Sequence, residues 1–75
     1  MGNLADVKIG KLYELIGVNY NAPLKIRRRI LELGFTNGQK VKVIRKSLLG
    51  KAYLVELRGF TLTIRKDIAQ LINVK

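Results

Sequence analysis

The sequence predicts a mainly β protein, a small, partly closed barrel with one short α-helix between the first two strands. Alternating apolar and polar residues recur through the second half of the chain, and a single stretch of the first half has helical spacing. The chain has 75 residues, so we expect one domain, residues 1–75. A small open sheet would expose its edges, and closure removes them.

The first strand is expected within residues 7–18, where glycines mark a bend before the strand. Residues 19–22 have the composition of a turn, and we expect Asn21 to cap a helix whose first turn contains Pro23. The helix should bury one stripe of apolar residues at i, i+4 and i+7, which are Ile26, Ile30 and Leu33.

The end of this helix is marked by Gly34, which stands where a left-handed residue would stop it. Phe35 follows, and it can fold back onto the last helical turn. The pair Asn37-Gly38 is typical of a tight turn. From residue 40 the chain alternates as KVKVIRK, which predicts a half-buried strand with its valines facing inward.

Two further strands are expected at residues 52–58 and 60–65, paired with each other. Each has one apolar face, formed by Tyr53, Val55 and Leu57 in the first strand and by Phe60, Leu62 and Ile64 in the second. Residues 66–71 predict one helical turn, and residues 72–75 a closing strand.

Catalysis is not expected, because the chain has no histidine and no cysteine and its single serine, Ser47, has no partner base. The five acidic residues are scattered, and no phosphate-binding glycine motif occurs. We therefore expect no enzyme and no catalytic, cofactor-binding or metal-binding residues. The lack of cysteine suits the cytoplasm, and no apolar run reaches the roughly 18 residues of a membrane span.

The net charge of +10 indicates an acidic partner: nucleic acid, an anionic lipid surface or an acidic protein face. A protein that binds single strands would interleave aromatic residues with these charges. Here the aromatic residues fall mostly at expected core or turn positions, and the basic residues divide among several elements. A small basic nucleic-acid-binding barrel remains the alternative function.

The connection between the expected strands at residues 40–46 and 52–58 contains Leu48 and Leu49 beside Gly50. An apolar tip surrounded by basic residues would suit docking on a partner. The equally weighted alternative is that one or both leucines pack under the barrel.

Two segments resemble the FeoA family, the small cytosolic SH3-like proteins associated with ferrous iron uptake. Residues 31–38, LELGFTNG, are similar to the family's LELGF-x-x-G, which an alternating valine strand follows. Residues 48–74 contain a second ordered set of matching positions: Gly50, Gly59, Leu62, Ile64, Arg65, Ala69 and Ile72. One departure is Leu48, which stands where the family usually has proline.

The resemblance implies an SH3-like barrel that serves as an accessory protein of a FeoB-type membrane ferrous iron transporter, binding protein and not iron. We expect docking on the cytosolic portion of that transporter, and expected exposure assigns the candidate contacts as Arg45, Lys46, Leu48, Leu49, Lys51 and Arg58. The positive charge also predicts weak association with an anionic membrane surface, at the inner face. The sequence leaves homo-oligomer formation open.

Overall fold

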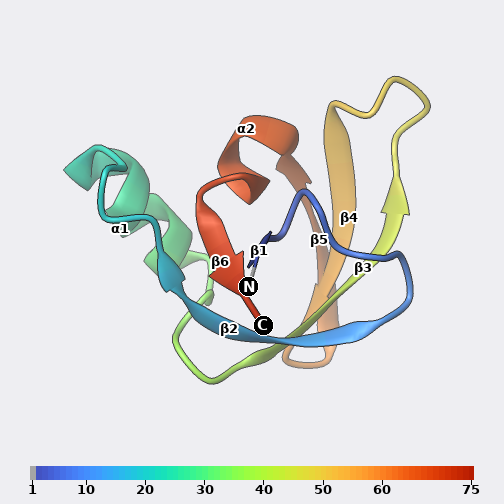
Figure 1. The fold of residues 1–75 in the computed structure, drawn as a ribbon, viewed down its shortest axis with the longest axis horizontal. Coiled ribbons are helices and arrows are strands. Elements are labelled where there is room, and N and C mark those ends of the chain that lie inside the picture. The colour runs from blue at the N-terminus through green and yellow to red at the C-terminus, as the bar shows by residue number, and fades with distance from the viewer. Residues whose placement is uncertain (1) are drawn as a thin grey trace.

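The computed structural model describes residues 2–75 and has the mainly β architecture that the sequence predicts (Figure 1). Its elements in chain order are β1 (Gly2–Asn3), β2 (Leu12–Val18), α1 (Leu24–Glu32), β3 (Lys40–Lys46), β4 (Ala52–Leu57), β5 (Phe60–Arg65), α2 (Lys66–Ala69) and β6 (Ile72–Val74). The helix α1 lies between the first two long strands, as expected, and the short strand β1 was not anticipated.

The six strands form one antiparallel sheet in the order β1-β6-β2-β3-β4-β5. The strand β2 has two partners: residues 12–14 pair with β3, and residues 15–18 pair with β6, with a register shift between Leu15 and Gly17. A shift of this kind bends a strand and increases its twist. The bend in β2 wraps the sheet around its core. The edge strands β1 and β5 do not pair with each other, so the barrel is only partly closed.

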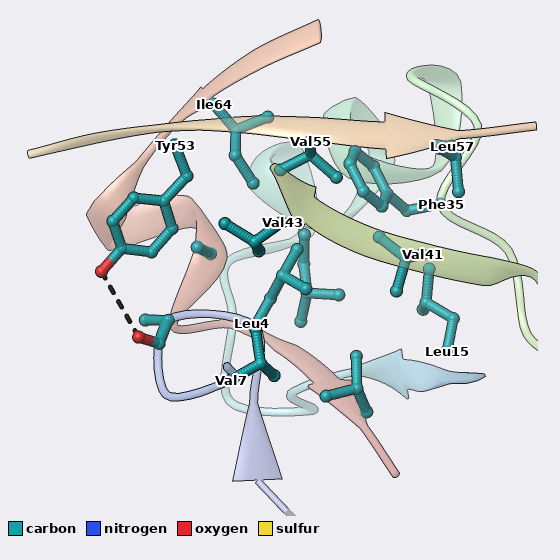
Figure 2. Packing of buried hydrophobic residues seen from close by; sticks show 14 of the residues in the cluster. Leu4, Val7, Leu15, Phe35, Val41, Val43, Tyr53, Val55, Leu57 and Ile64 are labelled. Atoms are coloured by element: carbon teal, nitrogen blue, oxygen red, sulfur yellow. Dashed lines mark hydrogen bonds between the residues drawn. The ribbon is translucent and has the colours of Figure 1, made fainter. Parts of the chain in front are cut away.

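The core fills the space between the two arms of this sheet (Figure 2). Alternation in β3 and β4 directs one side chain in two inward, as predicted, and the inward residues are Val41, Val43, Tyr53, Val55 and Leu57. Phe35 is fully buried among them. Leu4 and Val7, which lie before β2, also belong to the core and were not expected there.

The end of α1 has the geometry that its glycine predicts. Gly34 has φ of +104°, its N–H donates to Leu31 O at 3.0 Å, and the Phe35 N–H donates to Ile30 O at 3.3 Å. These two bonds form a Schellman motif. Of the predicted stripe, Ile30 is fully buried and Ile26 and Leu33 are partly buried against the core.

The start of α1 differs from the prediction, since Asn21 is not its cap. Pro23 occupies the capping position, and no side chain caps the helix. The Asn21 N–H instead donates to Asn19 Oδ1 at 2.9 Å, so the asparagines stabilise the preceding turn.

Two apolar residues of the strands lie partly outside the barrel, and one of them, Phe60, was expected on the apolar face of its strand. Leu12 is 55% exposed because it pairs with Lys42, whose side chain projects from the outer face of β3. Phe60 is 47% exposed, since it is the first residue of β5, next to the turn where the core ends.

Replacing Gly34 with alanine should lower the free energy of unfolding by about 1–2 kcal/mol, because an L-residue is strained at this backbone conformation. Space is not the cause, as an added Cβ would make only ordinary contact, 3.6 Å from Leu57. Urea denaturation measures the change. The matched control is Gly2→Ala, which meets no atom within 4 Å, and equal losses in the two variants would contradict the assignment.

Candidate interaction surface

The described residues contain no arrangement typical of catalysis or of metal binding. Within residues 2–75, no group of three or more His, Cys, Asp or Glu side chains is close enough to hold a metal ion. In the same part of the chain, no helix is both long and apolar enough to cross a membrane. The features that remain are on the surface, and they concern binding.

The loop between β3 and β4, residues 47–51, places two leucines in solvent. Leu48 is fully exposed and Leu49 is 78% exposed, so neither packs under the barrel. This resolves the two alternatives that the sequence left open. These two leucines are the most exposed of the chain's exposed leucines, and the others lie on helices or strands.

Backbone and side-chain hydrogen bonds hold this loop in one conformation. The Ser47 N–H donates to Ala52 O at 2.7 Å, and the Gly50 N–H donates to Ser47 O at 2.8 Å. The Ser47 hydroxyl accepts from the N–H groups of Lys51 and Ala52, each at 3.1 Å. The chain turns at Gly50, where φ is +69°. These bonds join Ser47 to Gly50, Lys51 and Ala52 and do not depend on any packing of the two leucines.

An open depression of about 280 Å³ lies at the base of the loop. It is lined by residues from β3, β4, β5 and the loop: Arg45, Lys46, Ser47, Leu48, Ala52, Tyr53, Leu54 and Thr63. Three of the predicted contact residues therefore border one hollow, and the two others in the loop, Leu49 and Lys51, lie beside it in the chain.

Lys46 is less free than the other predicted contacts. Its Nζ lies 5.2 Å from the centre of the Tyr53 ring and donates to Ala5 O at 3.4 Å. The Tyr53 hydroxyl donates to the same carbonyl oxygen at 3.4 Å, as Figure 2 shows. Lys46 therefore ties β3 to the segment before β2, whereas Arg45 is exposed and takes part in no salt bridge among residues 2–75.

Arg58 does not belong to this surface, contrary to the predicted rim. It lies in the turn between β4 and β5, at the other end of the six-residue strand β4, which is about 20 Å long. Figure 1 shows the two connections at opposite ends of the β4 ribbon. We use the term loop tip for Arg45, Leu48, Leu49 and Lys51, which the structure does bring together.

A second exposed apolar feature, on α1, was missed by the sequence analysis. Leu24 is 62% exposed and Leu31 is 45% exposed, and Tyr20 in the preceding turn is 82% exposed. Leu24 and Leu31 are seven residues apart, which places them on one face of the helix, roughly 100–120° around the helix from Ile30. That spacing was visible in the sequence, but the helix was read for its buried stripe alone.

The basic residues are divided among separate surfaces. Salt bridges join Lys40 to Glu14 at 3.5 Å, Lys42 to Glu56 at 3.8 Å and Arg65 to Asp67 at 2.9 Å. Phe35 and Tyr53 are buried in the core and offer no platform for stacking bases. Two rings are exposed, Tyr20 before the basic helix α1 and Phe60 beside Arg58, and they belong to separate elements. The structure therefore offers single exposed rings and not the series of stacking aromatic residues that binds single strands.

The fold and its surface define a class: a small SH3-like barrel whose distinctive exposed features are apolar residues with basic neighbours. The FeoA domain family model matches residues 2–75, and the chain belongs to the FeoA family, which is associated with ferrous iron transport. FeoA proteins are small accessory transport proteins and not a family of enzymes. The predicted resemblance and fold class are thus confirmed.

Individual relatives agree with this assignment. A Campylobacter jejuni protein provisionally named Fe(2+) transport protein A is 34% identical over 71 residues, covering 95% of this chain and 93% of that protein. FeoA from Chlorobium tepidum has 36% identity and a TM-score of 0.83, over 96% of this chain and 67% of that one.

A third relative is the zinc complex of FeoA from Stenotrophomonas maltophilia, described as a prokaryotic SH3 domain protein and suggested as an activating factor for ferrous iron transport. It has 25% identity and a TM-score of 0.84, over 100% of this chain and 91% of that one. Both values support the SH3-like description of the fold.

Lys46→Met should lower the free energy of unfolding by roughly 0.5–1 kcal/mol, because it removes the ammonium group above the Tyr53 ring. Arg45→Met, one position earlier and on the exposed side, should stay within about 0.5 kcal/mol of the wild type. Urea denaturation of the two variants tests whether Lys46 is a structural residue. If the two variants are equally stable, Lys46 is not a structural residue and stays available as a contact residue beside the loop tip.

Proposed function

We propose that this protein is a cytosolic accessory protein of ferrous iron uptake that docks on the cytosolic portion of a FeoB-type membrane transporter. The contact is made by the loop tip. The observation that carries the proposal is the ordered loop that holds Leu48 and Leu49 in solvent. The family's association with ferrous iron transport supports the choice of partner.

The exposed leucines are costly in water and gain free energy when a partner covers them. Full burial of one leucine side chain is worth about 1.5–3 kcal/mol. The hydrogen bonds of Ser47 already fix the loop, so less conformational entropy is lost on binding. A small apolar contact of this kind suits a weak, reversible regulatory complex.

Arg45 and Lys51 give the loop tip its specificity and its rate of association. A polar rim around an apolar centre is the usual anatomy of an interface. Charges at a rim act mainly on the rate of encounter, and the net charge of +10 favours an acidic partner surface. The partner site should therefore be an apolar hollow with carboxylates at its margin.

Leu48→Asp combined with Leu49→Asp should reduce capture of the protein by the immobilised cytosolic portion of the transporter at least tenfold, because the interface loses its apolar centre. Titration in the same format gives the dissociation constants. The barrel should stay folded, since neither side chain touches the core.

The matched control replaces two other exposed apolar residues, Ile9 and Leu12, with aspartate. These are 54% and 55% exposed and lie outside the loop tip, so capture should be unchanged. Equal recovery of the wild type and the loop variant would remove the loop tip from the interface. Loss in both variants would show a general effect of added negative charge.

The competing function, nucleic-acid binding, can be distinguished from docking on a transporter by how its affinity depends on salt concentration. Each phosphate neutralised on duplex DNA contributes a slope of about −0.9 in a plot of log affinity against log salt. Because the cations lie on separate surfaces, we expect a few contacts at most and no submicromolar affinity at physiological salt. Tight binding that persists there would favour the nucleic-acid function over docking.

A further inference from the structure

The outward face of α1 combines apolar and basic side chains in a pattern that folding does not require. Leu24 and Leu31 lie on this face, and Tyr20 is exposed in the turn before it. Arg28 is exposed next to the leucines, Lys25 and the acidic Glu32 are exposed roughly 100° around the helix from them, and Arg29 lies on the far side. Leu24 and Leu31 belong neither to the core cluster nor to the residues packed against it, so their contribution to the packing of the barrel is small.

The charges in the first turn of α1 are also unfavourable for the helix itself. Its first turn contains no acidic residue, although acidic side chains are the ones stabilised at a helix N-terminus. Lys25 and Arg27 stand there instead. Of the three salt bridges among residues 2–75, none includes a residue of α1. Four cations and a single acid, Glu32, thus share a nine-residue helix. Arg27 is half-buried and donates to Asn19 O at 3.4 Å, whereas Lys25, Arg28 and Arg29 are exposed.

The helix is placed so that a flat surface can reach it. Figure 1 shows α1 at one side of the barrel, away from the β3–β4 loop and from the segment before β2. The molecule measures 29 × 25 × 23 Å, which exceeds the Debye length of about 10 Å at 0.1 M salt. A charged surface therefore interacts strongly only with the charges on the side of the protein that faces it. For a surface beside α1, the cations of this helix matter more than the net charge of the whole protein.

We propose that α1 binds the surface of an anionic lipid bilayer, with Leu24, Leu31 and Tyr20 in the headgroup region and Lys25 and Arg28 on lipid phosphates. Apolar and aromatic residues flanked by cations on one helix face are typical of helices that lie in the interface plane. Nucleic acid would use the cations but leave both leucines in water. The bilayer accounts for both kinds of side chain.

This inference deepens the proposed function, because a protein held at the membrane meets a membrane transporter more often. The two sites are nonetheless separate: the loop tip contacts the transporter, and α1 contacts lipid. A flotation experiment with vesicles contains no transporter, so its failure leaves docking intact, and the failure of docking leaves the lipid contact intact.

The test is flotation of the purified protein with vesicles at low salt. Vesicles of equimolar phosphatidylcholine and phosphatidylglycerol should carry the protein, and vesicles of phosphatidylcholine alone should not. Lys25→Gln with Arg28→Gln should weaken partitioning about fivefold for each charge removed. Leu24→Gln with Leu31→Gln should weaken it about tenfold, and glutamine keeps the helix propensity of leucine.

Matched controls remove the same groups elsewhere. Lys8→Gln with Lys11→Gln removes two exposed cations from the segment before β2, and Leu12→Gln removes one exposed leucine from the barrel. These controls should partition almost as the wild type does. Far-ultraviolet circular dichroism confirms that each variant keeps its helix.

Three results would overturn the proposal. The first is no flotation of the wild type with anionic vesicles at low salt. The second is equal loss in the α1 variants and their controls, which would make the effect one of net charge alone. The third is unchanged flotation of the α1 variants together with loss of capture by the transporter's cytosolic portion, which would make the α1 face a protein contact.

Discussion

One bent strand holds this small barrel together. β2 pairs with β3 through residues 12–14 and with β6 through residues 15–18, so the two arms of the sheet depend on the same seven residues. The bend between Leu15 and Gly17 lets one strand serve both arms. Without it the sheet would stay open and its valines would face water. The buried side chains, the fixed end of α1 and the loop positions all follow from this closure.

Closure also determines what remains for function. With few residues available for a core, every inward position of β3 and β4 is used for packing, and the cations are placed outside. Ile9, Leu12, Ile44 and Phe60 stay partly in water as well. The loop tip and the outer face of α1 differ from these because the loop tip contains the two most exposed leucines, and α1 combines two exposed leucines with several cations. The account of function rests on these two surfaces.

Much of the fold could be predicted from the sequence because local rules and the tertiary structure agree. The alternation of Val41 and Val43, the stop at Gly34 and the return of Phe35 are each encoded within a few residues. The errors arise where neighbouring elements decide. Leu12 faces outward because of its pairing with Lys42, and Leu4 is buried because a segment before β2 folds into the core.

The candidate surface was only partly predictable for the same reason. Adjacent residues in one loop, Leu48 and Leu49, could be recognised as a tip from the sequence. Arg58 could be excluded from this tip only once the structure showed that it lies at the other end of β4. Lys46 could be recognised as structural only from its distance to the Tyr53 ring. Sequence proximity is a good guide within a loop and a poor one across a hairpin.

The most direct measurement of the central claim is an NMR titration of the labelled protein with the cytosolic portion of the transporter. The account predicts that amide shifts change at residues 45–52 and that the turn at residues 58–59 and the helix α1 remain unperturbed in the absence of lipid. Changes centred on the β4–β5 turn, or no changes at saturating partner, would contradict docking through the loop tip.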